Sequence, residues 1–162
     1  TDPNKLYDMV IVVGGLHHLH PYTLKGIDEI HNLLRPNGLF FFIEPHAGSI
    51  FDLCRKIWYP FDPIFASNEK SIDLNFLERI KKYNFIFEKK IYGGHLAFLF
   101  VYNALIFRIP LKIRKIISPI LMMLEDLIPP RFKFMSAFSM NIWRKRSKSS
   151  EYLSQITPQN AP

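Results

Sequence analysis

Two short apolar runs, separated by one helix-length segment, constrain this chain more than any other feature of its sequence. Residues 9–13 read MVIVV and residues 39–43 read LFFFI. Uninterrupted β-branched and aromatic runs are typical of strands covered on both faces in a parallel sheet, because a half-exposed strand would alternate apolar and polar residues. Between them, residues 21–35 carry apolar side chains near the 3.6-residue repeat of a helix. The sequence therefore predicts a right-handed βαβ unit and an α/β fold.

Further elements are predicted beyond this unit. Residues 44–69 hold prolines and scattered aromatic residues, which indicates irregular structure with one short helix over 51–57. Asp73 is placed to cap a helix over residues 74–83, with Leu77 and Ile80 turned inward. Two more strands are expected, at residues 85–92 and 132–143, the second of them antiparallel.

The composition limits the class of protein. With 162 residues, of which 48% are hydrophobic, the chain is long enough for one domain with a sizeable core. Its single cysteine, Cys54, excludes an internal disulfide and favours a reducing compartment, so we expect a cytoplasmic protein. Residues 1–8 are polar and show no signal peptide. Because the chain starts without methionine and soon enters a buried strand, we expect it to be a piece of a longer protein.

The chain is basic, and part of its positive charge is concentrated near the C-terminus. Lysine and arginine outnumber aspartate and glutamate by 21 to 14. Four of the cations lie close together: Arg144, Lys145, Arg146 and Lys148. Because no aromatic residues are interleaved with them, the run is typical of solvated charge rather than of nucleic-acid recognition. We expect a domain over residues 1–146, a disordered polar tail over 147–162, and no nucleic-acid partner.

The first predicted strand ends at paired glycines, and histidines follow at once; residues 12–21 read VVGGLHHLHP. A metal site would use His17, His18 and His20, but adjacent residues in a turn seldom face one ion and no zinc spacing is present, so we expect no metal. A catalytic base would be His17 or His18, since a neutral imidazole can accept a proton near neutral pH. Alternatively the turn forms the rim of a ligand pocket, because open α/β sheets bind ligands at the carboxyl ends of their strands.

Three short motifs between residues 7 and 46 make the order of elements more specific. They are YDMV in the first strand, LHHL directly after it, and LRPNGLF at the entry to the next strand. In this order, the segment resembles the fourth strand, the following helix and the fifth strand of a class I S-adenosylmethionine-dependent methyltransferase of the small-molecule type 11 kind. The resemblance implies a Rossmann-like three-layer sheet, incomplete because only its C-terminal half is present, with a helical insertion at residues 95–130 before the last strand. The family's glycine-rich cofactor loop would precede this chain.

The resemblance also implies roles for single residues. Four would line the methionine half of the cofactor, S-adenosylmethionine: Val13, Gly14, Gly15 and Leu16. Two would face the methyl acceptor as catalytic residues: His17 and His18. At the end of the second strand, Glu44 and His46 would contact the substrate, although Glu44 could instead bind the backbone of the following loop. The expected acceptor is a small molecule, such as a sugar, a lipid-linked compound or an aromatic compound, and the fragment alone is expected to be inactive.

The insertion leaves a second class of function open. Residues 110–128 separate apolar from charged side chains at helical spacing, which predicts an amphipathic helix bent or interrupted at Pro119. This helix would pack on the core or cover the substrate as a lid. Otherwise it would dip into a bilayer surface, helped by Lys112, Arg114 and Lys115. We therefore weigh an enzyme against a non-catalytic module that binds a partner or a membrane surface through its insertion. The oligomeric state stays open.

Overall fold

In the computed structural model, the described residues are 5–61, 69–95, 97–98, 100, 109–129 and 132–147. Their helices and strands are, in chain order, β1 Tyr7–Val13, α1 Thr23–Leu33, β2 Leu34–Pro45, α2 Ile50–Trp58, α3 Leu74–Lys81, β3 Phe85–Gly93, α4 Leu111–Asp126 and β4 Phe138–Lys145. Three short 3-10 turns join them: η1 Leu16–Leu19, η2 Tyr59–Phe61 and η4 Lys133–Met135. The tail expected over residues 147–162, except its first residue, and parts of the insertion expected over 95–130 lie outside the described residues.

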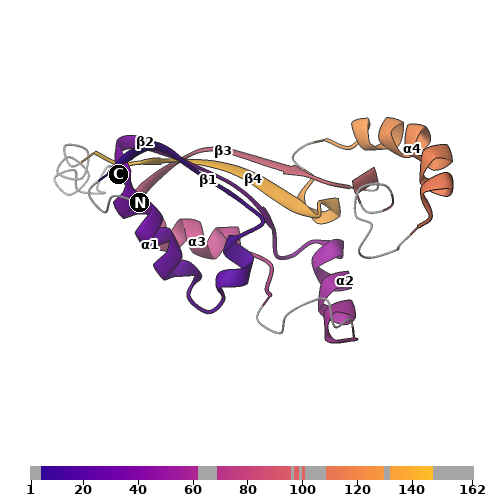
Figure 1. The fold of residues 1–162 in the computed structure, drawn as a ribbon, viewed down its shortest axis with the longest axis horizontal. Helices are drawn as coiled ribbons and strands as arrows, with labels where there is room; N and C mark the ends of the chain where they lie inside the picture. The colour runs from indigo at the N-terminus through magenta and orange to yellow at the C-terminus, as the bar shows by residue number, and fades with distance from the viewer. Residues whose placement is uncertain are drawn as a thin grey trace, which may run out of the picture.

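The strands form one mixed sheet in the order β1-β2-β4-β3 (Figure 1). β1 and β2 pair in parallel, with Met9 opposite Leu39 and Val13 opposite Ile43. β4 runs antiparallel to both β2 and β3. Because α1 connects the two parallel strands, the predicted βαβ unit is confirmed.

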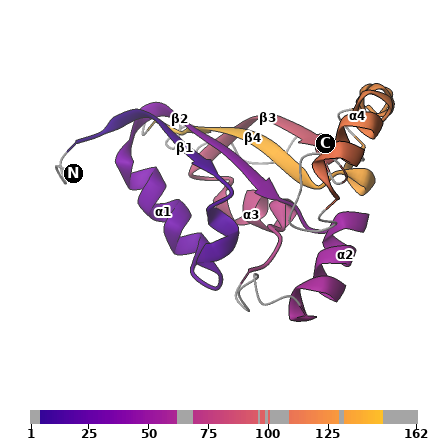
Figure 2. The same ribbon diagram turned by 45° about the vertical axis from the view of Figure 1, so that its right-hand side comes forward.

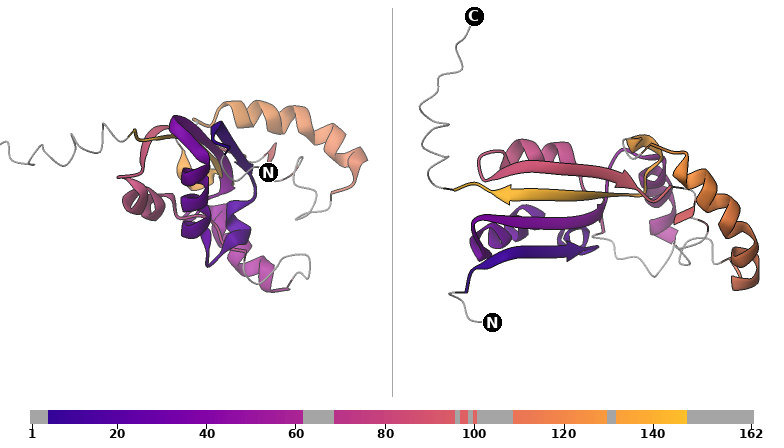
Figure 3. Two further views of the ribbon diagram at one scale, coloured as in Figure 1. Left: turned by 60° about the vertical axis from the view of Figure 1, so that its left-hand side comes forward. Right: turned by 90° about the horizontal axis from the view of Figure 1, so that it is seen from above.

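Helices α1 and α3 lie against the same face of the sheet, as Figure 1 and the view from above in Figure 3 show. The opposite face is open along β1, where Met9 is 47%, Ile11 61% and Val13 65% exposed. The alternate residues Val10 and Val12 pack against the core. The expectation of a strand covered on both faces is therefore wrong for β1, which is one of the two edge strands of the described sheet. An apolar run predicts a strand but does not reveal which faces are covered.

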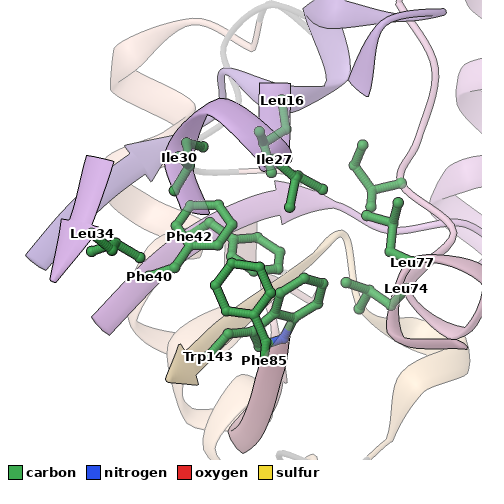
Figure 4. Close-up of a cluster of buried hydrophobic side chains, with 11 residues drawn as sticks. Leu16, Ile27, Ile30, Leu34, Phe40, Phe42, Leu74, Leu77, Phe85 and Trp143 are labelled. Atoms are coloured by element: carbon green, nitrogen blue, oxygen red, sulfur yellow. The ribbon is translucent and has the colours of Figure 1, made fainter. Parts of the chain in front are cut away.

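The core lies between the sheet and this helix layer, and aromatic rings fill its centre (Figure 4). Trp143 of β4 is 1% exposed. Its ring centroid lies 4.9 Å from that of Phe42 and 4.8 Å from that of Phe87. Phe40 stacks on Phe42 at 4.6 Å. Because these rings come from β2, β3 and β4, the cluster joins the parallel and antiparallel parts of the sheet.

The cap of α3 matches the sequence pattern, and its inward face does so in part. The side chain of Asp73 accepts a backbone hydrogen bond from the first turn of α3 at 3.0 Å, as predicted. Leu77 is buried, but Ile80, which the spacing also placed inward, is 45% exposed. The next residue, Lys81, takes the inner position instead and pairs with Asp28 of α1. An ion pair between the two helices therefore occupies space that the pattern assigned to an apolar side chain.

Part of the basic run belongs to the sheet. The strand expected over residues 132–143 is shifted: β4 starts only after η4, and it includes Arg144 and Lys145. Lys145 Nζ donates to the carbonyl oxygens of His31 and Leu34, each at 2.8 Å. Arg144 pairs with a glutamate of β3. The expectation of solvated charge is therefore wrong for these two cations, which tie the end of β4 to its neighbours.

Helix α4 continues through Pro119 as a single element, and none of its residues is buried. In Figure 2 it stands at the end of the sheet, away from α1 and α3. Packing of this helix in the core is therefore wrong, and the interpretations as a lid over the substrate and as a helix on a membrane surface remain. Within the part of the chain that the structure describes, no helix is both long and apolar enough to cross a membrane.

Candidate functional site

β1 and β2 end side by side, and the turn after β1 carries the glycines singled out in the sequence. Gly14 N donates to Ile43 O at 2.8 Å, so the parallel ladder extends one residue past β1. The φ of Gly14 is 63°, in the left-handed region that glycine enters without strain. At Gly15, an added Cβ would lie 2.9 Å from Val12 Cγ1. The backbone of this turn therefore requires glycine at position 14, and at position 15 a side chain would displace that of Val12.

Glu44, near the end of β2, holds the turn in place. Its side chain is fully buried, at 0% exposure. One carboxylate oxygen accepts hydrogen bonds from the backbone N–H groups of Gly15 and Leu16, both at 2.7 Å. The other accepts from His17 N at 3.3 Å and from His17 Nδ1 at 2.7 Å. A buried carboxylate needs such partners, because losing its water without compensation is costly.

The bonds of Glu44 bear on its expected substrate contact. Both of its oxygens are used by the turn that follows β1, and the side chain has no exposed surface. This geometry favours the alternative of a backbone-binding acid, although the backbone it binds is that of the neighbouring turn rather than of its own loop. Glu44 thus positions the turn and the histidine beside it.

His17 receives its orientation from Glu44. Because a carboxylate only accepts hydrogen bonds, we assign the proton of His17 to Nδ1, which leaves Nε2 with a lone pair. The side chain is 14% exposed, and its ring lies 4.0 Å from that of His18, centroid to centroid. A ring held in this way can accept a proton at Nε2. The structure therefore distinguishes the two histidines that the sequence left equivalent.

The third histidine of the motif takes no part in this cluster, and an acid from elsewhere does. His17, His18 and Glu69 bring one possible ligand atom each to within 4.8 Å of one another, a set that could hold a metal ion, and His20 does not belong to it. The same arrangement can be explained without a metal ion, by contacts between the side chains themselves. His18 Nδ1 lies 3.5 Å from Glu69 Oε1, and His17 Nδ1 faces Glu44. Sequence reasoning missed Glu69, which a backbone contact brings here: Lys70 N donates to His17 O at 3.5 Å.

The other predicted site residues lie in different surroundings. Val13 is exposed beside the turn, whereas the side chain of Leu16 is 1% exposed and belongs to the hydrophobic core. Leu16 therefore cannot line a cofactor pocket with its side chain. His46 is also buried, with its ring 4.9 Å from that of Tyr92 and its Nδ1 3.0 Å from Ala47 O. The pKa of His46 is lowered, chiefly because burial disfavours the charged ring.

Helix α2 is attached to the carboxyl end of the sheet by polar residues. Ser49 Oγ accepts from Asp52 N at 3.1 Å, and the Asp52 carboxylate accepts from Gly48 N at 3.0 Å. Burial alone would raise the pKa of Asp52, but hydrogen bonds from Ser71, Gly48 and Lys56 lower it overall. The Ser-x-x-Asp spacing resembles the capping-box pattern and could have located this helix start.

Arg55 is a second residue that sequence reasoning missed. Its guanidinium donates to Ala137 O at 3.1 Å and to His46 O at 3.4 Å. The first of these contacts joins α2 to the segment before β4, which is 82 positions away in the chain. No local pattern predicts a contact across such a distance.

Comparisons with known proteins give the fold a name. No protein-family model matches the sequence, and no curated protein matches it significantly. Among solved structures, a SAM-dependent methyltransferase from Archaeoglobus fulgidus superimposes with a TM-score of 0.50 and 17% identity over 88% of this chain. The fold is that of the class I methyltransferases. In the methyltransferase fold, the glycine turn and His17 lie at the carboxyl end of a parallel strand, where open α/β sheets bind their ligands.

A second methyltransferase, NodS from Bradyrhizobium japonicum WM9, was solved in complex with S-adenosyl-L-homocysteine and matches 91% of this chain at 12% identity, with a TM-score of 0.47. The chain spans 61% of the length of the Archaeoglobus protein and 53% of NodS. By the match to the Archaeoglobus protein, the chain is comparable to part of a methyltransferase fold.

Proposed function

We propose that this chain is part of an enzyme that transfers a methyl group from S-adenosylmethionine to a small-molecule acceptor. The observation that carries the proposal is the turn after β1, which Glu44 clamps at the carboxyl end of a parallel strand in a methyltransferase fold. The single cysteine supports a reducing, cytoplasmic location. The acceptor classes to be tested are sugars, lipid-linked compounds and aromatic compounds.

The surroundings of Gly14 support the proposed contact with the methionine half of the cofactor. A Cβ built on Gly14 would meet only the His17 ring, at 3.9 Å, so the backbone of Gly14 can be approached closely. Val13, directly before Gly14, is 65% exposed. Val13, Gly14 and Gly15 fit the proposed cofactor contact, and Leu16 contributes only its backbone.

Each residue of the turn has a distinct role in the proposed reaction. When bound, the cofactor supplies a methyl group on a sulfonium, so the protein mainly positions the acceptor and excludes water. His17 would take the proton from the acceptor hydroxyl or amine at Nε2. Glu44 would hold the His17 ring by its Nδ1–H and stabilise the charge that develops there. His18, which is half exposed, would face the acceptor from the outer side of His17.

The test uses the full-length protein that contains this chain. Calorimetry with S-adenosylhomocysteine is expected to show binding, and tritiated S-adenosylmethionine is expected to label a compound in one of the three acceptor classes. His17→Gln should lower kcat by about 10²-fold to 10⁴-fold, the usual contribution of a general base, while leaving S-adenosylhomocysteine binding within about twofold.

His20→Gln is the matched control, because this histidine belongs to the same motif but lies outside the cluster of His17 and His18. It should leave kcat unchanged. Absence of heat with S-adenosylhomocysteine would refute the proposed cofactor. A His17→Gln enzyme as fast as the wild type would refute the base and leave the proposed reaction without its proton acceptor.

A further inference from the structure

Helix α2 turns its apolar side to solvent and its polar side to the protein. Four of its apolar residues, counting the turn η2 that follows, are exposed at helical spacing: Ile50 41%, Leu53 57%, Ile57 62% and Phe61 84%. The polar residues Asp52 and Arg55 lie on the other side, where they bond to the loop after β2 and to the segment before β4. A surface helix of a globular domain ordinarily buries its apolar stripe. In α2 most of the apolar side chains face solvent instead, and Phe51 is the buried exception.

Helix α4 also has an apolar stripe that faces solvent. At steps of 100° per residue, six exposed side chains fall within one sector: Ile113 49%, Ile116 74%, Ile120 61%, Met123 61%, Leu124 37% and Leu127 73%. The less exposed residues Ile117, Leu121 and Glu125 fall in the next sector. The stripe is therefore a continuous apolar side of the helix, although Leu111 and Met122 are exposed outside it.

Glu125 shows which side of α4 faces the protein. Its carboxylate accepts hydrogen bonds from His95 N at 2.6 Å and from Ala97 N at 2.9 Å, directly after β3. At 100° per residue, Ile120 lies about 140° around the helix from Glu125, so anchoring one side turns the stripe outward. The solvent exposure of the stripe follows from a specific attachment.

Lysines border both stripes, although Lys56 of α2 also pairs with Asp52 and α4 carries the exposed Asp126 near its C-terminal end. Lys112 and Lys115 are exposed in the first half of α4, whose first turn contains no acidic residue. On α2, the side chain of Lys56 is 68% exposed. The whole chain carries a formal charge of +7. Apolar side chains bordered by lysines match the hydrocarbon boundary and the phosphate layer of an anionic membrane.

The two helices lie at the same end of the molecule. Figures 1 and 2 show α2 and α4 beyond the carboxyl end of β2, whereas α1 and α3 lie under the sheet. With 16 residues, α4 is about 24 Å long, shorter than the hydrocarbon core of about 30 Å, so it suits the interface rather than a span. We infer that α2 and α4 dock the protein on the surface of an anionic lipid bilayer.

The arrangement of the exposed apolar side chains favours a bilayer over a folded protein as the partner. The stripes stand on two separate helices and are bordered by lysines, and a bilayer accepts apolar side chains without a matching shape. Docking would bring the glycine turn, at the same end of the sheet, close to lipid. The inference does not depend on methyl transfer, because vesicle binding can be measured without cofactor or acceptor.

The test is flotation of the full-length protein that contains this chain, with vesicles of phosphatidylcholine alone or mixed with phosphatidylglycerol. Wild-type protein should float with the mixed vesicles and bind less at high salt, since screening weakens the lysine contribution. The double variant Ile116→Glu, Ile120→Glu should bind at least about tenfold less, because it places two carboxylates where apolar side chains enter the interface. Leu53→Glu with Ile57→Glu tests α2 in the same way.

The control places equal charge on an apolar surface remote from both helices. Met9→Glu with Ile11→Glu alters exposed residues of β1, and Ile11 has the same 61% exposure as Ile120. This variant should float like the wild type, and circular dichroism should confirm that all variants fold. The inference would be overturned by wild-type protein that stays in the bottom fraction while the mixed vesicles float. An α4 variant that binds as well as the wild type would also overturn it. So would a dimer that the α4 variant disrupts in the absence of vesicle binding, since the stripe would then join two copies.

Discussion

Glu44 and His17 are the residues whose function depends most on each other. Sequence reasoning placed each of them separately at the end of a predicted strand, Glu44 as a substrate contact and His17 as one of two equivalent bases. The hydrogen bond between them, at 2.7 Å, makes Glu44 a positioning residue. It fixes the orientation of the His17 ring. A buried acid that satisfies three backbone N–H groups and an imidazole also supports the fold around it.

Glu44→Gln is expected to destabilise the protein by about 1–3 kcal/mol, because the amide would turn an NH₂ group toward buried N–H donors. Urea unfolding monitored by tryptophan fluorescence measures the change in the free energy of unfolding. Glu29→Gln on the exposed side of α1 is the control and should leave it within about 0.5 kcal/mol. Equal stability of the two variants would contradict the role assigned to Glu44.

His46 should make the folded state sensitive to acid. Burial lowers its pKa below the ordinary value of 6.5, so the unfolded chain binds a proton at this residue before the folded chain does. The free energy of unfolding should therefore fall as the pH drops below about 6.5, in the window down to the lowered pKa. His46→Gln should flatten this part of the profile.

Denaturant midpoints at pH 7.5 and 5.5 test this expectation. Tyr92→Phe is the control, because it keeps the ring that contacts His46 and should preserve the wild-type loss of stability. If His46→Gln loses as much stability between the two pH values as the wild type, another group causes the acid sensitivity.

At the scale of single elements, α2 shows how a helix can be positioned by its polar side. Among its residues, Phe51 and Asp52 are the buried ones, and its apolar stripe faces solvent. With little apolar area against the core, the cap at Ser49 and the contacts of Arg55 must supply much of what holds it. Local order in α2 should therefore be unusually sensitive to its cap.

Ser49→Ala is expected to cost about 0.5–2 kcal/mol in stability, the usual range for loss of a helix N-cap. Hydrogen exchange within α2 should increase more than in α1, because the loss is local. Ser118→Ala, inside α4, removes no capping bond and should leave exchange in α2 unchanged. Unchanged exchange in α2 on removal of the Ser49 hydroxyl would show that other contacts hold this helix.

For the molecule as a whole, the aromatic cluster around Trp143 is the part that all of the central strands share. Trp143→Ala should lower the free energy of unfolding by about 3–5 kcal/mol, a large part of the about 5–15 kcal/mol typical of a domain. The chain has two tryptophans, and Trp58, 45% exposed on α2, provides the control. Chemical denaturation followed by circular dichroism should show a small change for Trp58→Ala, and similar losses for both variants would contradict the assigned core.

The elements of this fold were largely predictable, and their environments were not. The βαβ unit, the cap at Asp73 and the helix around Pro119 follow from patterns within a few residues, because helix and strand periodicity are local properties. The same patterns wrongly predicted that Ile80 faces inward and that both faces of β1 are covered. A local pattern carries no information about which other element packs against a helix or strand. The site residues divide in the same way: the glycine turn was visible in the sequence, whereas Glu69 and Arg55 were not.

By itself, the sequence determined the α/β class, the parallel pair of strands and the glycine turn at their end, because backbone conformation and hydrogen-bond periodicity depend on nearby residues. Only the tertiary structure decided that Glu44 binds the turn, that His17 and not His20 joins the cluster, and that α2 and α4 expose their apolar sides. These outcomes depend on contacts between residues far apart in the chain. Such contacts form when the strands and helices pack, and no periodicity in the sequence records them.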